Sequence, residues 1–516
     1  MSAKSEGIAP NASRLLWAGF MAILAAGVGY SVRGGILGQW AEQFGFTMTE
    51  LGAITGGGLT GFGIVIILSS LIADKVGYGK LMLLAFGLHF ISAVITLAAP
   101  AAFASGGKEA AFNCLFWGMF IFAIGNGLCE AVVNPLTATL FPNNRAHYLN
   151  ILHAGWPAGL VIGGLSSAFM SAKTNEAGEV ISAAVDWKIQ MSLFLVPVIL
   201  YGLMLFGQKF PKSEAAGAGV TLGGMIKTVF APLMLVLLII HALVGYVELG
   251  TDSWISKITG SIMASPMKGL MLFVYTSMLM FCLRFVAGPI VHKISPLGLL
   301  FVSAILGATG LTLLSSAQTV VLCVVAATVY ACGKTFLWPT MLAVVSERFP
   351  KGGAVAIGMV GGVGMLSAGL LGGPAIGFKQ DFNASKNLEQ VAPATYERYK
   401  ADKENSFMGY KAVGLDGAKV GVLEDNGKEL ARAGELLAKE GKKDENHAKL
   451  ATWWAAAQPM AAEDKKPVQS AGVFGGQMAL KLTAYVPMVM AVLYLFLILY
   501  FKAIGGYKPV QLDEKH

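Results

Sequence analysis

The stretch LGAITGGGLTGFGIVIILSSLIADKVGYGKLMLLAFGLHFISAVITLAA, residues 51–99, consists of two apolar runs with one short polar turn between them. The runs, 51–73 and 80–99, each hold about twenty residues, which is the length that a helix needs to cross the hydrocarbon core of a bilayer. The turn at residues 73–80 is short and carries charge. The segment therefore predicts two membrane-spanning helices joined by a turn on one face of the membrane.

The rest of the chain repeats this pattern, which indicates an all-α membrane protein. Only 13% of its 516 residues are charged, whereas a soluble domain carries about 25%. Its 64 glycines suit the close packing of membrane helices. Ten further apolar runs bring the expected spans to twelve; they lie at 14–37, 111–140, 148–171, 189–207, 231–257, 267–291, 297–316, 318–345, 354–378 and 477–503. The first of these is too long for the apolar core of a cleavable signal peptide. We expect a monomer embedded in the lipid bilayer.

Several classes of protein and site are excluded by composition and motifs. The five cysteines all lie in apolar segments and predict neither a disulfide framework nor a metal site. The net charge of +8 does not indicate nucleic acid, because the basic residues lie in short loops where they set membrane topology. No Walker A motif or Gly-x-Ser-x-Gly elbow occurs. We therefore expect neither an enzyme nor a primary pump, and no cofactor.

Charge in the short loops predicts the orientation. With the N-terminus inside, the inner segments contain fourteen Lys and Arg residues and the outer loops five. The positive-inside rule then places both termini in the cytoplasm, for a protein of the cell's inner membrane. The polar stretch 208–230 becomes a cytoplasmic linker between two six-helix halves, 1–207 and 231–516. A second short turn at 291–296 supports duplicated halves, although His292 stands where the first turn has Asp74.

Residues 379–475 differ from the rest of the chain. They hold 15 of the 30 acidic residues and lie between the last two spans, on the outer face. Stretches 394–405 and 427–457 are predicted to be helical, with Gly, Asp and Asn separating them at 414–427. The Trp453–Trp454 pair predicts packing against another surface, such as the outer mouth of the helix bundle. So long a loop is either a small cap or partly disordered.

Ionisable and polar side chains occur at membrane depth, where burial costs several kcal/mol and usually marks function. In transporters such residues line a substrate site near the midplane between the halves. Asn126 and Asn134 lie four residues to either side of Glu130 and share its helix face. The candidates for the substrate and proton pathway are Arg33, Asn126, Glu130, Asn134, His153, Trp156, Tyr246, Glu248, Asp252, Lys334 and Trp338.

Some of these residues have a structural alternative. Arg284 either lines the pathway or holds the nearby inner turn, and we group it with Asp74, Lys75, Gly77 and Lys80 as a gating loop. Asp252 is either part of the site or solvated at the outer edge. The aromatic residues either stack on a sugar ring or fill the bundle core. Four prolines in apolar helices free backbone carbonyls where a cavity is lined; they are Pro135, Pro157, Pro289 and Pro339.

The turn Asp74–Lys80 resembles the loop signature of the major facilitator superfamily. Four further stretches are similar to the fucose–proton symporter family, which includes bacterial glucose/galactose transporters. They are Gly125–Glu130 with Asn134-Pro135 and Leu149-Asn150, Arg284-Phe285 with Gly288, Ile290 and Ser295-Pro296, Gly245–Glu248, and Trp338–Thr340. This resemblance implies that Glu130 occupies the place of that family's membrane glutamate in proton coupling.

The sequence departs from that family at two places. That family has an acidic residue in span one, whereas the matching region of this chain, Ser31–Gly35, has no carboxylate and contains Arg33. In span five that family has Gln and Asn, where this chain has His153 and Trp156. Arg33 therefore either pairs with Glu130 or binds an anionic group of the substrate. We favour the internal pair.

We expect a secondary transporter that moves a small polar solute, with a sugar as first choice, by alternating access and proton symport. An organic-anion carrier would instead use Arg33 and Lys334 as substrate clamps. A sensor or scaffold that does not transport would use the bundle to anchor residues 379–475. Counterflow against sugars and sugar acids separates these readings.

Overall fold

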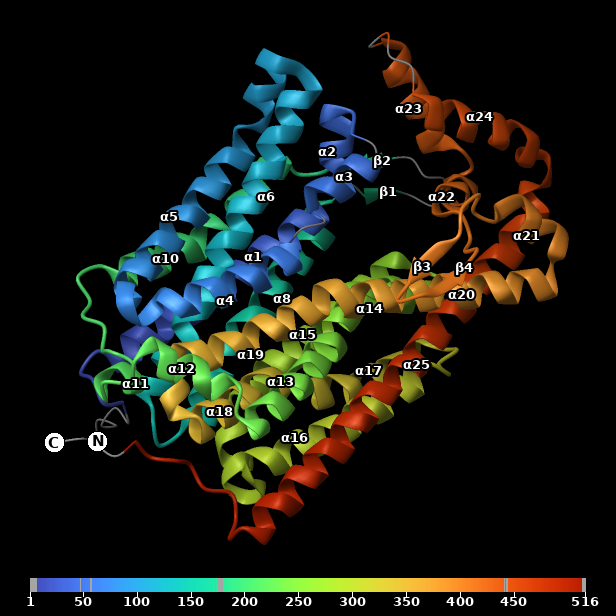
Figure 1. The fold of residues 1–516 in the computed structure, drawn as a ribbon. Helices are drawn as coiled ribbons and strands as arrows, with labels where there is room; N and C mark the ends of the chain where they lie inside the picture. Colours follow the sequence, from blue (N-terminus) through green and yellow to red (C-terminus); the bar gives the residue numbers. More distant parts are fainter. Residues whose placement is uncertain are drawn as a thin grey trace.

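The computed structural model describes residues 7–46, 48–55, 58–171, 173–174, 180–439, 441 and 444–512, and it is a bundle of long helices (Figure 1). The helices of the N-terminal half are α1 Ala12–Gly35, α2 Leu37–Phe44, α3 Met48–Thr55, α4 Gly58–Val76, α5 Tyr78–Leu97, α6 Ala99–Leu140, α7 Arg145–His153, α8 Gly155–Met170, α9 Trp187–Ser192 and α10 Leu195–Leu205. Before α9 stands a two-stranded hairpin, β1 Lys173–Thr174 and β2 Val180–Ser182.

The linker and the C-terminal half follow in the same helical pattern. The linker contains α11 Glu214–Gly217 and α12 Leu222–Val229. The membrane part of the second half contains α13 Pro232–Gly245, the π-helix η1 Tyr246–Gly250, α14 Thr251–Ile262, α15 Pro266–Arg284, α16 Ala287–Leu314, α17 Val320–Lys334, α18 Leu337–Arg348, the 3-10 turn η2 Pro350–Gly352, α19 Gly353–Ser367, the π-helix η3 Ala368–Gly372, α20 Gly373–Val391 and α25 Ala461–Ala503.

Eleven helical segments of the described residues are long and apolar enough to cross a membrane. The remaining expected span, 148–171, is formed by α7 and α8, which meet at Ala154. Ala154 keeps right-handed helical angles, φ −61° and ψ −19°, and its N–H donates to the Asn150 carbonyl at 3.0 Å. The chain therefore continues through this joint on one path, and the expectation of twelve crossings agrees with eleven long helices plus this jointed pair.

Both predicted turns are breaks in the helical backbone at a residue with positive φ. After α4 the turn is a real break, because Gly77 has a φ of +93°, which favours glycine. The second turn, at 291–296, divides α16 into two helices at Ser295, which has a φ of +66° and a ψ of +163°. This break agrees with the turn expected there, and Pro296 starts the helix that follows it.

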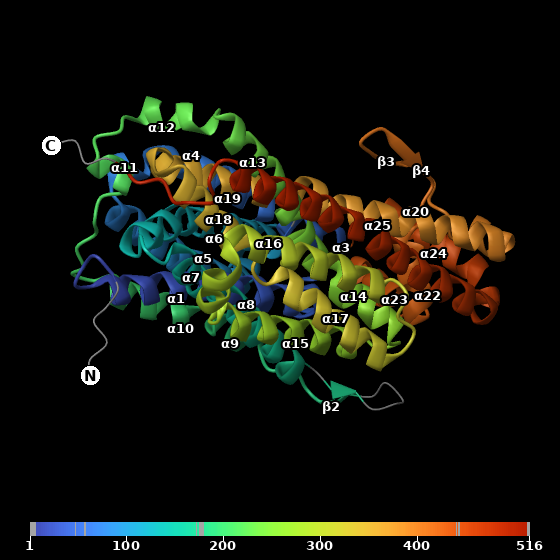
Figure 2. The same cartoon turned by 90° about the horizontal axis from the view of Figure 1, so that it is seen from below.

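The helices of the two halves pack directly against one another, with α4 against α19, α8 against α15, and α7 against α16 and α18 (Figures 1 and 2). Gly63 of α4 lies against the carbonyl of Gly362 in α19, so closely that any side chain at Gly63 would clash. Such contact between backbones is what small residues permit in membrane bundles. The described ends of the chain lie at one end of the bundle, where Ile8 N–H binds the Leu140 carbonyl and Val510 N–H the Glu347 carbonyl.

Residues 379–475 form a small folded cap built on two helices of the bundle. Helices α20 and α25 continue out of the membrane part side by side (Figure 1, orange and red). Between them lie α21 Pro393–Tyr399, β3 Asn405–Phe407, β4 Tyr410–Ala412, α22 Gly417–Asp425, α23 Lys428–Lys439, α24 Glu445–Ala457 and the 3-10 turn η4 Gln458–Met460. A core of their own holds these elements together, with Leu388, Tyr399, Leu423, Trp454 and Val468 among its buried members. Residues 440, 442 and 443 lie outside the described part.

Several expectations for the cap were wrong. The helix expected at 394–405 ends at Tyr399, and α22 occupies part of 414–427, where no helix was expected. Asp416 explains this helix, because its side chain caps the N–H groups of Ala418 and Lys419. The tryptophan pair packs inside the cap, not on the outer mouth: Trp454 is buried in the cap core and Trp453 Nε1 donates to the Arg398 carbonyl at 3.0 Å.

Candidate functional site

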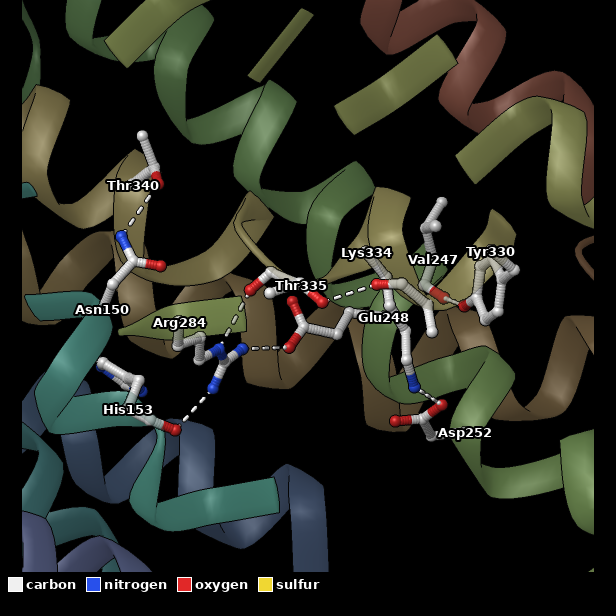
Figure 3. A network of polar contacts seen from close by, with 11 residues as sticks. Asn150, His153, Val247, Glu248, Asp252, Arg284, Tyr330, Lys334, Thr335 and Thr340 are labelled. Atoms are coloured by element: carbon white, nitrogen blue, oxygen red, sulfur yellow. Dashed lines mark hydrogen bonds and ion pairs between the residues drawn. The ribbon is translucent and has the colours of Figure 1, made fainter. Parts of the chain in front are cut away.

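Arg284 is the centre of a buried polar network between the two halves (Figure 3). Its Nη2 donates to Glu248 Oε1 at 3.0 Å, and its Nε donates to the Thr335 carbonyl at 2.9 Å. Its Nη1 crosses to the N-terminal half and donates to the His153 carbonyl at 2.5 Å. One guanidinium therefore joins three segments, and the expectation that Arg284 belongs to the gating loop was wrong.

Proline explains why two backbone carbonyls are free to accept from Arg284. In an α-helix the carbonyl of a residue accepts from the N–H four positions later. Pro157 stands four residues after His153, and Pro339 stands four residues after Thr335. Because proline has no N–H, both carbonyls lack their helical donor. The sequence prediction that these prolines free carbonyls at a functional position agrees with this geometry.

The other members of the network also stand where helices are interrupted. Arg284 is the last residue of α15, His153 the last of α7, and Lys334 the last of α17. Glu248 lies in the π-helix η1, a form that occurs often at functional sites. Interrupted helices near the midplane are the usual way in which transporters expose polar backbone to a solute.

A second ion pair lies one helical turn beyond Glu248. The Lys334 ammonium contacts the Asp252 carboxylate, and the Lys334 side chain is 1% exposed. The same ammonium lies 5.4 Å from the centroid of the Tyr330 ring, and the Tyr330 hydroxyl donates to the Val247 carbonyl at 2.7 Å. Asp252 is thus a member of the buried network, and the alternative that it is solvated at the outer edge was wrong.

Glu130 joins the network from the N-terminal half through neutral groups. Asn134 Nδ2 donates to Glu130 Oε2 at 2.5 Å, and Asn134 Oδ1 contacts His153 Nε2 at 2.8 Å. Glu130 is buried on α6. Arg284 lies close enough for its charge to act on Glu130, but the ion pair of Arg284 is with Glu248. Among the three central carboxylates described, Glu130 is the one whose hydrogen-bond partner is a neutral amide.

Arg33 and Asn126 lie in a separate group inside the N-terminal half. Arg33 donates to the Gly29 carbonyl and to Ser92 Oγ, at 3.2 and 3.3 Å. Asn126 Oδ1 contacts His89 Nε2 at 2.9 Å. The expected pair between Arg33 and Glu130 is therefore absent from the described contacts, because Arg33 binds its own helix at Gly29 and Ser92 of α5. Sequence reasoning missed His89 and Ser92, although a histidine in the middle of an apolar span was a usable signal.

Aromatic side chains with free polar atoms border the central network. Trp338 lies against His241, with ring centroids 4.6 Å apart, and Trp156 lies 5.7 Å from Tyr30. Within the described residues, Trp156 Nε1 and both ring nitrogens of His241 are buried without a hydrogen-bond partner. Tyr246 lies further out, where its hydroxyl accepts from Lys379 Nζ at 2.9 Å. Trp338, His241, Trp156 and Tyr30 supply apolar faces, and two of them, Trp156 and His241, also supply unused polar atoms.

The gating loop lies at the end of the bundle where the described termini meet. Asp74 lies near Gly353, the first residue of α19, while Lys75 and Lys80 are exposed.

The structure adds contacts that the sequence did not indicate. Arg145 pairs with Glu214 of the linker at 2.6 Å and also donates to the Ser346 carbonyl. Tyr507 donates to Glu347 at 2.6 Å, so the C-terminal segment is fastened to the end of α18.

Comparison with known proteins gives a consistent result for the fold. A sequence model of the Major Facilitator Superfamily matches residues 19–373. No curated protein matches the chain. Among solved structures, the transporter FucP in its outward conformation is similar, with a TM-score of 0.58, 16% identity, and 71% of this chain and 92% of that chain covered.

Two further structures show the same fold. A bacterial homologue of the human lysosomal transporter Spinster, inward-facing and occupied, has a TM-score of 0.56 and 16% identity, covering 98% of this chain and 100% of its own. The human organic anion transporter MFSD10 has a TM-score of 0.53 and 14% identity, covering 75% of this chain and 96% of its own. At such identities the likeness concerns the fold alone.

Proposed function

The chain belongs to the Major Facilitator Superfamily and is a multi-pass secondary transporter, and we propose that it carries a neutral polyhydroxylated solute, such as a sugar, together with a proton. The solute would bind at the Arg284 network between the halves. Residues 1–207 and 231–516 would act as the two moving halves, with 208–230 as the linker.

Charge balance at the centre is the observation that supports a neutral solute. The two cations of the network each have their own carboxylate, Arg284 with Glu248 and Lys334 with Asp252. An organic anion would have to displace one of these carboxylates at the cost of leaving it buried and unpaired. Arg33, the other clamp of the anion hypothesis, lies in a different group of residues. A solute that hydrogen-bonds without bringing charge meets neither obstacle.

The free polar atoms of the network support a hydroxyl-rich solute. Trp156 Nε1 offers a donor, the His241 ring offers a donor and an acceptor, and Glu248 Oε2 offers an acceptor, all without a partner among the described residues. Buried polar atoms that stay unpaired are costly, so binding a solute that pairs them is favourable. Aromatic rings beside hydrogen-bonding groups suit a pyranose, which has both apolar faces and hydroxyl edges.

Glu130 is the proposed proton carrier, because it is the central carboxylate without an ion pair. A carboxylate held by a cation stays charged, whereas one held by an amide can gain and lose a proton. The chain Glu130–Asn134–His153 leads to the carbonyl that Arg284 binds. Protonation of Glu130 would thus act on the contact between the halves.

Counterflow into liposomes tests the solute class. We expect liposomes loaded with the substrate to take up labelled neutral sugar, and the matching sugar acids not to compete. The panel should include pairs that differ only in one carboxyl group, such as glucose and glucuronate, so that size stays constant. Empty liposomes provide the control. Uptake of the acids alone would reject the proposal in favour of an organic-anion carrier.

We also propose that both termini face the cytoplasm and the cap faces outward. The positive-inside count supports this, and the cap and the described termini lie at opposite ends of the helices (Figure 1). Two of the counted residues, Lys4 and Lys515, lie outside the described part. An alkaline phosphatase reporter fused within the cap, at the exposed Gly417, is expected to be active, because this enzyme matures outside the cytoplasm. The same reporter after Lys502 should be inactive, and the reverse pattern would disprove the orientation.

A further inference from the structure

We propose that the N-terminal half binds a small monovalent inorganic anion, of the size of chloride, at the guanidinium of Arg33. This site is separate from the Arg284 network and does not depend on which solute is transported. The anion would serve as a fixed counter-ion and not as cargo.

The buried cations differ in whether they have a counter-ion. Four Lys and Arg residues of the described chain are buried: Arg33, Arg145, Arg284 and Lys334. Three of them have a carboxylate partner, namely Glu214, Glu248 and Asp252. Arg33 forms no ion pair among the described residues, and its hydrogen bonds go to the Gly29 carbonyl and Ser92 Oγ. A guanidinium at 1% exposure without a counter-ion is the exception in this protein.

The surroundings of Arg33 are neutral and attract it only weakly. Its carbon Cζ lies 4.0 Å from the centroid of the Phe122 ring and 4.9 Å from that of Phe194. Its two hydrogen bonds, to the Gly29 carbonyl and to Ser92 Oγ, are long at 3.2 and 3.3 Å. The Nε–H is buried and has no partner among the described residues. The rings cover the guanidinium, while its Nε edge keeps an unused donor for an anion.

The described residues that contact His89 and Ser92 carry no negative charge. His89 is fully buried, and both its ring nitrogens are held by neutral groups: Nδ1 by the Tyr201 hydroxyl and Nε2 by Asn126 Oδ1, each at 2.9 Å. Tyr201 and Ser92 are also fully buried or nearly so. The group as described therefore has one uncompensated positive charge in a low-dielectric setting, where such a charge is costly.

Charge and size define the ligand class. A monovalent anion neutralises the single positive charge of the site, whereas divalent sulfate would give the site a net negative charge. Ser92 and His89 beside the guanidinium are fully buried, so the ligand class is a small inorganic ion and not an organic acid. Arg33 lies two residues before the end of α1, on the side where the expected outer loops begin.

Thermal unfolding of the full chain in detergent tests the site. Chloride is titrated against methanesulfonate at constant ionic strength, so that general salt effects cancel. We expect a saturable rise in Tm of about 2–3 °C, because a ligand that binds only the folded state stabilises it by mass action. Bromide should replace chloride, and sulfate should not. A Tm that does not depend on chloride would overturn the proposal.

Two variants and a second readout locate the ion. Arg33→Gln should abolish the chloride response, and Ser92→Ala should weaken it. Lys268→Gln removes an exposed cation and should keep the full response. Chloride-35 line broadening on the wild type and on Ser92→Ala reports binding directly if Arg33→Gln fails to fold. Chloride binding that persists in Arg33→Gln would contradict the proposal. Displacement of chloride from the wild type by sugar acids would also contradict it, because it would assign Arg33 to the substrate.

Discussion

Replacing Glu130 by glutamine is expected to abolish proton-driven accumulation while leaving exchange of the solute intact. Glutamine keeps the shape of the side chain and can still hydrogen-bond to Asn134, so the network should remain assembled. It cannot release a proton, so only the steps that need deprotonation should stop. The accumulation ratio should fall to about one, because a carrier that merely exchanges cannot concentrate its solute.

The measurement compares two modes in the same proteoliposomes: uptake driven by an inward proton gradient, and counterflow without a gradient. Counterflow by Glu130→Gln should also lose its dependence on pH, because the titrating group is gone. Glu109→Gln is the matched control, since Glu109 is an exposed carboxylate on the same helix, α6. Accumulation that survives in Glu130→Gln at normal expression would remove Glu130 from coupling. Loss of counterflow as well would instead give it a role in solute binding.

The sequence was sufficient for the features that depend on local pattern. Apolar length predicted twelve spans. Eleven match helical segments long and apolar enough to cross a membrane, and 148–171 is formed by α7 and α8, which meet at Ala154. Four-residue spacing placed Glu130 and Asn134 on one face, and the structure joins them. Pro157 and Pro339 predicted a free carbonyl four residues before each of them, because the missing N–H is a property of proline itself.

The sequence was insufficient where a side chain chooses among partners from distant helices. Arg33 and Arg284 look alike in sequence, as single cations in apolar runs. In the structure the partners of Arg284 come from residues 36 to 131 positions away, while Arg33 turns toward Ser92, 59 positions away. Which helix lies opposite each cation is a matter of bundle packing, which periodicity alone does not encode. The α22 helix of the cap was missed for a related reason, since its glycines hid a helix that Asp416 caps and the cap core holds.

Replacing Arg284 by glutamine is expected to destabilise the bundle more than any other single change discussed for the central site. Glutamine removes the charge opposite Glu248, whose second oxygen has no partner among the described residues. Breaking a buried ion pair by removing one partner costs about 3–5 kcal/mol. The carbonyls of His153 and Thr335 also lose their donor, and a buried unpaired acceptor costs about 1–3 kcal/mol. These costs overlap and do not simply add.

A double substitution separates the charge from the backbone contacts. In Arg284→Gln with Glu248→Gln no unpaired carboxylate remains, so the double variant should unfold at a higher temperature than Arg284→Gln alone. The loss should be smaller than the sum of the two single losses by at least about 1 kcal/mol, as expected for residues in contact. Arg284→Lys should fall between wild type and Arg284→Gln, because an ammonium keeps the charge but lacks the planar fork that reaches three acceptors. Thermal unfolding in detergent compares the wild type with these four variants, Glu248→Gln alone included. Strict additivity would mean that the pair with Glu248 does not stabilise the fold, and that Arg284 acts through the two proline-freed carbonyls alone.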